Sequence, residues 1–375
     1  MKGLNEKGND LVLPRVKDKK PLLIAGPCSA ESETQILSVA ESLAAQKKVQ
    51  LFRAGIWKPR TRPDNFEGIG EKGLHWLRRV QEEFGMPAIT EVANARHTRE
   101  ALDQGLKYLW IGARTTVNPF SVQDIADALK GAPVTVFVKN PIHPDINLWM
   151  GAIERIQNAG VAHVGAIHRG FSTFRSSPYR NIPLWEIPIE LQRRFPDLTL
   201  ICDPSHIAGS RPLIPLVSQK ALDLNMAGLM VEVHPNPEEA WSDAKQQLTP
   251  GHFHDMVDLL SVRSEHGSDD VFINQLEELR DKIDKLDEEI LSALEVRLKM
   301  IEQIGQYKRQ NNVTVYQIDR WNEILKTRAK MGGELGMDAE FVKKLMELIH
   351  VESIRIQTGI MQDPSQGQDP LSGQE

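Results

Sequence analysis

The sequence predicts an α/β barrel followed by an all-α domain, and three observations carry this prediction. Eight short apolar runs alternate with helical or mixed segments over about the 250 residues that a (β/α)8 barrel takes. Reactive polar side chains follow nearly every run, as they do at the carboxyl ends of barrel strands. From residue 271 onward, apolar residues recur instead at helical three- and four-residue steps.

The eight apolar runs are short and rich in β-branched residues, as buried parallel strands are. After the first run, a helix is expected over residues 30–46, entered through Ser29 or Ser32. A doubly wound sheet is the competing α/β arrangement, and we rank it lower because no GxGxxG follows any strand. The expected strands cover residues 21–28, 49–55, 87–92, 108–113, 134–140, 163–170, 198–205 and 228–234.

Composition bounds the class of protein. With 375 residues, 41% of them hydrophobic and 26% charged, the chain can build a large globular domain and a smaller one. A formal net charge of -6 argues against a nucleic-acid partner. No segment reaches the roughly 18 apolar residues of a membrane span, and the start lacks a signal-peptide core. Cys28 and Cys202 are too few for a disulfide framework. We therefore expect a cytoplasmic protein with no membrane partner.

Changes of pattern suggest five segments. A polar arm (1–20) precedes the barrel (21–260), and SVRSEHGSDD loses the apolar period and is expected to be a linker (261–270). A helical domain (271–361) follows, with helices expected over 271–309, 317–331 and 338–358. The polar, Gly/Pro-rich end (362–375) is expected to be a disordered tail.

Several apolar runs end in side chains that can bind metal. Cys28, His206, Glu232 and Asp243 form a mixed sulfur, nitrogen and oxygen set suited to a divalent transition metal. Mn2+ ranks first, and Zn2+, Fe2+ and Co2+ are further candidates. Because the four residues are scattered, they are a weak signal by themselves: Cys28 could be a buried thiol and Asp243 a helix cap.

Cationic side chains follow the same strand ends. Any one of them would more often be a solvated loop group, but their recurrence favours a site. Six cations at one mouth suggest substrates that carry more than one phosphate or carboxylate, gripped by guanidinium forks. They are Arg53, Lys58, Arg60, Arg114, Lys139 and Arg169.

Three cations of the first long helix pose a geometric question. Arg297 and Lys308 are eleven residues apart, about three turns, and share a face. Arg280 precedes Arg297 by seventeen residues, about 25 Å along the helix and roughly a quarter turn round. If all three serve one site, Arg280 must come from a partner chain, which predicts an intertwined homodimer. The alternative is that they are solvated charges on an acidic helix.

The barrel motifs carry a resemblance. GPCSAES, RAGIWKPRT, TEV, IGAR, DPSH and EVHP followed by SDAKQQL resemble the short-chain first-type 3-deoxy-D-arabino-heptulosonate 7-phosphate (DAHP) synthases over about residues 21–261. The KPRT segment favours this family over the related 3-deoxy-octulosonate 8-phosphate synthases. The resemblance implies metal ligation by Cys28, His206, Glu232 and Asp243. It also implies a phosphoenolpyruvate site made by Arg114, Lys139 and Arg169, with Arg53 nearby. Lys58 would lie between the two substrates. Arg60 and Thr61 would bind the phosphate of erythrose 4-phosphate.

Two departures from that pattern concern the strand ends. His168 stands where relatives commonly have Glu, and Lys139 is followed by Asn140-Pro141 rather than Arg-Gly. His168 and Glu91 are the two candidates for ordering the attacking water.

The helical segment is similar to the all-helical chorismate mutases. The motifs are LEELRDKIDKLDEEILSALEVR, GQYKR, DRW and ESIRIQ, over about residues 271–361. The resemblance implies a dimer with exchanged long helices and a pocket lined by Arg280 of the other chain, Arg297, Lys308, Arg320 and Gln357. Lys308 and Gln357 would donate to the breaking ether oxygen. Gln317 and Trp321 replace acidic residues of a well-studied branch, and Glu323 is a candidate substitute one turn along.

The resemblances imply a bifunctional enzyme, both transferase and isomerase. It would condense phosphoenolpyruvate with erythrose 4-phosphate and rearrange chorismate to prephenate, with chorismate or prephenate in the helical domain signalling to the barrel. The alternative is an octulosonate 8-phosphate synthase whose helical domain is a non-catalytic binding and dimerisation module. Assembly beyond a dimer stays open.

Overall fold

The computed structural model describes residues 20–59, 66–174, 177–263 and 270–362. Residues 1–19 of the expected arm, the centre of the expected linker and residues 363–375 of the expected tail lie outside the described residues, as do Arg60 and Thr61. The chain divides into two compact units, Met1–Glu265 and His266–Glu375. Each unit is described by itself.

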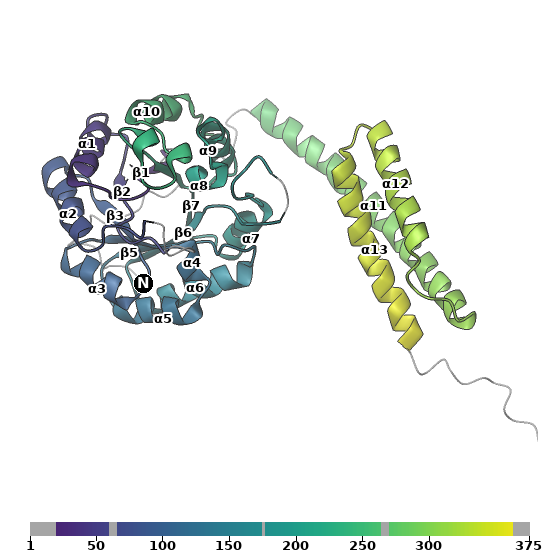
Figure 1. Ribbon diagram of the computed structural model, residues 1–375. Helices are drawn as coiled ribbons and strands as arrows, with labels where there is room; N and C mark the ends of the chain where they lie inside the picture. The colour runs from purple at the N-terminus through teal and green to yellow at the C-terminus, as the bar shows by residue number, and fades with distance from the viewer. Residues whose placement is uncertain (1–19, 60–65, 175–176, 264–269, 363–375) are drawn as a thin grey trace, which may run out of the picture. The chain divides into compact units, whose positions relative to one another are not determined.

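The first unit is a closed barrel of eight parallel strands in chain order, which confirms the predicted fold class (Figure 1). Closure comes from β1 pairing with β8, where Leu22 lies opposite Gly228 and Gly26 opposite Glu232. Each strand falls within one of the eight expected apolar runs. The strands are β1 (Leu22–Gly26), β2 (Leu51–Arg53), β3 (Ala88–Val92), β4 (Tyr108–Ile111), β5 (Thr135–Lys139), β6 (His163–His168), β7 (Thr199–Cys202) and β8 (Gly228–Glu232).

Helices surround the barrel (Figure 1). The first of them begins after Ser32, whose side chain accepts a hydrogen bond from the Gln35 amide at 3.1 Å, so Ser32 rather than Ser29 is the cap. The α-helices are α1 (Glu33–Ala44), α2 (Lys72–Phe84), α3 (Ala95–Asp103), α4 (Ala113–Thr116), α5 (Pro119–Ala128), α6 (Ile146–Asn158), α7 (Glu186–Arg194), α8 (Pro204–Ala208), α9 (Ile214–Asp223) and α10 (Pro250–Leu259), and the 3-10 turns are η2 (Arg211–Leu213), η3 (Pro237–Glu239) and η4 (Ala244–Gln246).

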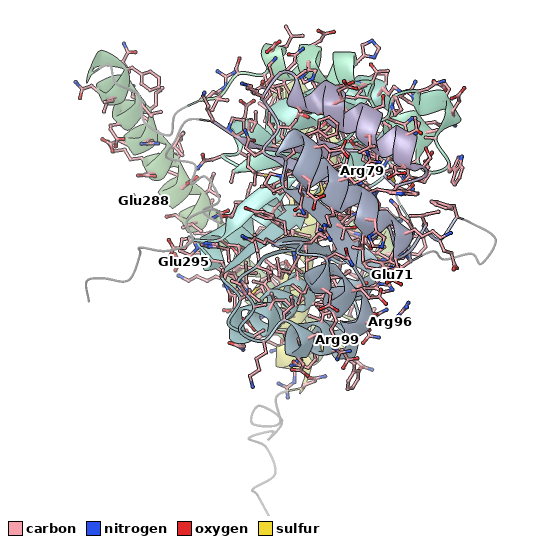
Figure 2. All side chains as sticks on the ribbon, turned by 90° about the vertical axis from the view of Figure 1, so that its left-hand side faces the viewer. Glu71, Arg79, Arg96, Arg99, Glu288 and Glu295 are labelled. Atoms are coloured by element: carbon pink, nitrogen blue, oxygen red, sulfur yellow. The ribbon has the colours of Figure 1, made fainter. Side chains whose placement is uncertain are left out.

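The strands bury both faces, which is why they read as continuous apolar runs. One core fills the barrel interior and includes Ile24, Trp110 and Ile167. A second core lies between the strands and the helices. Because successive side chains alternate between these cores, the position at which a strand ends decides which polar side chains face the mouth. Charged residues such as Arg79 and Arg96 project outward from the helices (Figure 2).

The second unit consists of three helices, α11 (Asp270–Gln310), α12 (Ile318–Glu334) and α13 (Ala339–Gln362), close to the expected ranges. In it α13 packs against both α11 and α12. Much apolar surface stays exposed in the single copy, including Leu279, Ile283 and Ile290 of α11, each more than half exposed. Among the described helices, none combines the length and the apolar character that crossing a membrane would require.

Candidate active sites

Three of the four predicted metal ligands meet at the mouth of the barrel. Ligand atoms of Cys28, Glu232 and Asp243 all lie within 4.8 Å of one another, and Cys28 Sγ is 3.4 Å from Asp243 Oδ2. Cys28 follows β1, Glu232 is the last residue of β8, and Asp243 precedes the η4 turn. Bonds of about 2.0–2.3 Å to one ion would require donor separations of this order. The donor set therefore fits a single divalent transition metal.

His206 borders this cluster from α8. Its Nε2 lies 4.0 Å from Asp243 Oδ2, and its Nδ1 lies 3.7 Å from Glu232 Oε1 and 2.8 Å from Asp203 Oδ2. The Nδ1 contact with Asp203 is short, yet its direction does not meet the geometry of a hydrogen bond. The ring thus turns Nε2 toward Asp243, and its Nδ1 lies near both Asp203 and Glu232.

Local electrostatics keep most of these donors ready for a cation. Burial opposes ionisation of Glu232, but His206 and Arg53 lower its pKa; His206, Arg180 and Lys58 lower that of Asp243 against the same penalty. Burial lowers the pKa of His206, against the opposing effects of Asp203 and Glu232. Burial, helped by Glu232, raises the pKa of the Cys28 thiol to about 12. Metal binding would therefore have to displace the Cys28 proton.

Two predicted cations lie next to these ligands. Lys58 Nζ is 2.8 Å from Cys28 Sγ. Arg53 is 1% exposed, and its Nη2 lies 3.1 Å from Glu232 Oε1. Arg53 thus lies beneath the mouth, where its closest partner is a ligand carboxylate.

The other cations line a cleft at the mouth. Lys139, at the end of β5, donates to Asp203 at 2.7 Å. The Arg169 amide donates to Asn140 Oδ1 at 2.7 Å. Asn140, which departs from the family pattern after Lys139, therefore links the ends of β5 and β6. Burial and the nearby Arg180 lower the pKa of Arg169 to about 10, against the effect of Asp203, so it stays charged at neutral pH. The cleft is lined by Lys58, Pro59, Glu91, Ala113, Arg114, Lys139, Arg169, Arg180, His206 and Asp243.

A wider pocket, of about 400 Å³, lies at the amino ends of β6 and β7 and includes His163 and Leu198. Among the candidate ligands and substrate-binding cations that the structure describes, none lines it. The chemistry is therefore at the opposite, carboxyl end of the strands, although the cleft there is narrower.

His168 is removed from the candidates for ordering water. The interior position next to it on β6 is Ile167, so the His168 ring faces the helices and lies among Trp149, Phe171 and Trp185. It is fully buried, and burial lowers its pKa to about 3. Glu91 does line the cleft and accepts from Trp110 Nε1 at 3.0 Å.

Sequence reasoning missed several residues that hold the site. Arg180 Nη1 contacts Asp243 at 2.9 Å and Gln246 at 2.6 Å. Gln246 in turn donates to Glu232 at 2.6 Å, and Gln247 accepts from the Cys28 amide at 3.0 Å. Gln246 and Gln247 belong to the SDAKQQL motif, which also contains the predicted ligand Asp243. This shared motif is the sequence feature that could have indicated their role. Arg180 lies in a loop without periodicity.

Comparisons with known proteins agree with this geometry. Residues 14–266 match the DAHP synthetase I family, which is more than half of the chain. The chain belongs to the DAHP synthetase I family. Residues 279–358 match chorismate mutase type II, so this family member also carries a mutase domain.

Individual relatives cover the barrel. A phospho-2-dehydro-3-deoxyheptonate aldolase of Thermotoga maritima is 33% identical over 235 residues, 63% of this chain and 67% of the relative. A 2-dehydro-3-deoxyphosphooctonate aldolase of Protochlamydia amoebophila is 31% identical and matches 64% of this chain and 90% of its own. The crystal structure of the Thermotoga maritima DAHP synthase superposes with a TM-score of 0.57 at 30% identity, covering 64% of this chain and 68% of that one.

In the mutase domain, Arg297 of α11 and Gln357 of α13 both contact Ser353, and Lys308 reaches the segment between α11 and α12. Arg297 Nη1 donates to Ser353 Oγ at 2.8 Å, and Gln357 Nε2 donates to the Ser353 carbonyl at 3.3 Å. Lys308 Nζ donates to the Val315 carbonyl at 2.7 Å. Within the described residues, the buried Oε1 of Gln357 has no hydrogen-bond partner, as expected of a group that meets a ligand.

The two remaining mutase candidates each pair with an acidic residue of their own helix. Arg280 is exposed and pairs with Glu277 at 2.6 Å. Arg320 forms an ion pair with Glu323 at 2.6 Å, so the candidate substitute acid is already paired with this arginine. Trp321 stacks on His350 with ring centroids 3.9 Å apart. The departure at Trp321 therefore exchanges an acid for an aromatic pair beside the cations.

Proposed function

We propose that this DAHP synthetase family member condenses phosphoenolpyruvate with erythrose 4-phosphate in its barrel and rearranges chorismate to prephenate in its helical domain. The observation that carries the barrel assignment is the meeting of Cys28, Glu232 and Asp243 beside Lys58 and the other cleft cations. The assignment of the second reaction follows from the chorismate mutase match and the group formed by Arg297, Lys308 and Gln357.

The metal would be held by Cys28, His206, Glu232 and Asp243, with Mn2+ ranked first and Zn2+, Fe2+ and Co2+ as other candidates. When bound, it supplies Lewis acidity that polarises the aldehyde oxygen of the sugar phosphate. The mixed thiolate, imidazole and carboxylate donors support a transition metal but do not select one.

The cleft cations would bind the anionic substrate. Arg114, Lys139 and Arg169 hold phosphoenolpyruvate, and Lys58 lies between the two substrates. C3 of the enol phosphate then attacks the aldehyde carbon, water adds at C2, and phosphate leaves. Fixed cations stabilise the anionic oxygens throughout, because they need no reorganisation during the reaction. Glu91 is the proposed group for ordering the water.

Three further residues have narrower roles in this proposal. The burial of Arg53 favours an indirect role, in which it holds Glu232 beneath the substrate. Arg60 and Thr61 are proposed to hold the phosphate of erythrose 4-phosphate.

In the mutase domain, the arginines would bind the two carboxylates of chorismate. Arg297, Arg320 and Arg280 of the partner chain serve this purpose, and Lys308 and Gln357 donate to the ether oxygen whose negative charge grows as its bond breaks. Gln317 and Trp321 leave this pocket with fewer acidic groups than in a well-studied branch of these mutases. Rearrangement needs no nucleophile, so these substitutions affect rate more than binding.

We also propose a homodimer through the helical domain, without excluding larger assemblies. The exposed apolar residues of α11 support it, since a second copy would bury them. The exposure of Arg280 leaves it available to a partner chain. The boundaries 21–260, 261–270 and 271–361 remain the proposed domain limits. A cytoplasmic location is consistent with two buried free cysteines.

Feedback is a further part of this proposal. Chorismate or prephenate bound in the helical domain would lower synthase activity, a coupling free energy between two distinct sites. Synthase kinetics of the full-length chain that do not change when prephenate is added would contradict it.

Substrate choice tests the synthase assignment. We expect purified protein supplied with manganese to consume phosphoenolpyruvate with erythrose 4-phosphate and to show much slower consumption with arabinose 5-phosphate. The opposite preference would favour the octulosonate 8-phosphate alternative. Prephenate formation from chorismate by the same preparation would exclude a helical domain that serves only for binding and dimerisation.

A further inference from the structure

Asp203 is a fully buried carboxylate with one oxygen shared between two parts of the site. Its Oδ2 accepts from Lys139 Nζ at 2.7 Å and lies 2.8 Å from His206 Nδ1. Lys139 belongs to the proposed phosphoenolpyruvate site, and His206 to the proposed metal site. A single oxygen atom therefore touches both.

The position of this carboxylate is fixed by the backbone. Its other oxygen, Oδ1, caps α8 by accepting from the His206 amide at 3.1 Å. The Asp203 amide donates to the His168 carbonyl at 2.7 Å, which ties it to the end of β6. The backbone contacts therefore hold Asp203 in place when Lys139 or His206 moves. A change in the interaction of Oδ2 with one partner then alters its interaction with the other.

The two partners do not share the oxygen equally. Lys139 makes a hydrogen bond to it, whereas the contact with His206 Nδ1 falls short of hydrogen-bond geometry. Arg53 is a further cation near Oδ2, but its Nη1 is 3.9 Å away and its Nη2 is engaged by Glu232 at 3.1 Å. Lys139 and the His206 ring therefore compete for the negative charge of the same oxygen, with Lys139 holding the better geometry.

We infer that Asp203 is a positioning residue that couples phosphoenolpyruvate binding to metal binding through this shared oxygen. The inference rests on the proposed function. An anionic substrate attracts Lys139 away from Oδ2, which lets His206 Nδ1 complete its hydrogen bond to the carboxylate. A histidine whose Nδ1–H donates to a carboxylate is held in the tautomer that presents Nε2 and is a more basic ligand. Phosphoenolpyruvate thereby tightens metal binding, and by reciprocity the metal tightens phosphoenolpyruvate binding by the same factor.

The test uses Asp203→Asn in the full-length chain. Asparagine caps helices as well as aspartate does, so the hydrogen bond to the His206 amide is retained while the charged oxygen is lost. The matched control is Asp145→Asn, which makes the same chemical change at the cap of α6, where Asp145 is exposed and accepts from the Leu148 amide at 3.0 Å. Thermal transitions of both variants report whether folding is intact.

Two binding measurements give the result. The dissociation constant of Mn2+ is measured by competition with a chelator, with and without phosphoenolpyruvate, and that of phosphoenolpyruvate is measured by calorimetry, with and without Mn2+. In the wild-type chain and in Asp145→Asn we expect each ligand to tighten the other by about 5-fold or more. In Asp203→Asn we expect a coupling factor near one, and Mn2+ affinity weaker by about 10- to 100-fold.

Several outcomes would overturn the inference. An equal coupling factor in Asp203→Asn and the wild type would do so, because the coupling would then arise elsewhere, such as from direct attraction between the ligands. Independent binding of the two ligands by the wild-type chain would also overturn the inference. This result needs no variant, so it stands even if Asp203→Asn fails to fold. A wild-type chain that binds neither ligand would contradict the proposed function together with this inference.

Discussion

Arg53 offers a sharp prediction because it is a buried cation whose partner is a proposed metal ligand. Its side chain is 1% exposed, its Nη2 lies 3.1 Å from Glu232, and its guanidinium lies 5.1 Å from the centre of the Trp110 ring. Glu232 itself is fully buried. Arg53→Met keeps most of the volume but removes the charge, so a buried carboxylate loses its ion-pair partner.

The expected cost is large in the absence of metal. Removing one member of a buried ion pair costs about 3–5 kcal/mol, because the other charge remains in a medium of low polarity. A divalent ion at Glu232 would compensate the same charge. We therefore expect Mn2+ to recover part of the loss and to stabilise Arg53→Met more than it stabilises the wild type.

Urea unfolding of the barrel, followed by tryptophan fluorescence with chelator or with Mn2+, gives the free energies of unfolding. The matched control is Arg79→Met, since Arg79 pairs with Glu33 at 2.7 Å and Glu83 at 2.6 Å on the solvent side of α2 (Figure 2). Solvent screens such pairs, so we expect little change there. Equal effects of the two substitutions would refute the reasoning, and so would an Arg53→Met loss that Mn2+ leaves untouched.

Three more predictions follow from the structure. Burial lowers the pKa of His168 to about 3 in the folded chain, so only the unfolded chain binds a proton at this residue as pH falls below about 6.5. Between pH 6.5 and 5 the wild type should therefore lose about 1.5 kcal/mol more unfolding free energy than His168→Phe. Parallel pH profiles of the two proteins would contradict this. Lys308→Ala should lower mutase kcat by about 100-fold or more through loss of a transition-state donor, while synthase activity without added prephenate stays normal; a mutase rate near wild type would refute the role. Arg280→Ala and Arg297→Ala, each inactive as a mutase alone, should regain activity at about one quarter of the sites when mixed and reassembled, whereas no recovery would argue against shared pockets.

The sequence predicted the barrel well because its strands are buried on both faces and leave long apolar runs. It also predicted α11 to within a residue at each end, since the helical period continues without proline. Cys28 and Glu232 could be named because each follows or ends such a run, and parallel strands end at the same side of a barrel. Asp243 stands on the polar segment after β8, so strand ends alone do not account for its place beside them.

What the sequence could not show is the direction in which a side chain points where a strand ends. His168 and Lys139 both terminate strands, yet the His168 ring lies among aromatic side chains under the helices and Lys139 reaches the mouth. One residue more or less in a strand reverses this outcome, and strand ends are the least certain feature of a pattern. Arg180 was missed for another reason: a loop has no period, so nothing in its spacing indicates that it reaches Asp243.

We expect one metal centre, assembled from four separate segments, to be required for the synthase reaction. The most direct test removes metal with a chelator, titrates Mn2+ back, and follows both bound metal and phosphoenolpyruvate consumption with erythrose 4-phosphate, in the wild type and in Cys28→Ser. We expect activity to return in step with one bound ion per chain, and we expect Cys28→Ser neither to hold this ion tightly nor to recover activity. Full activity in the stripped wild type, or normal recovery in Cys28→Ser, would contradict it.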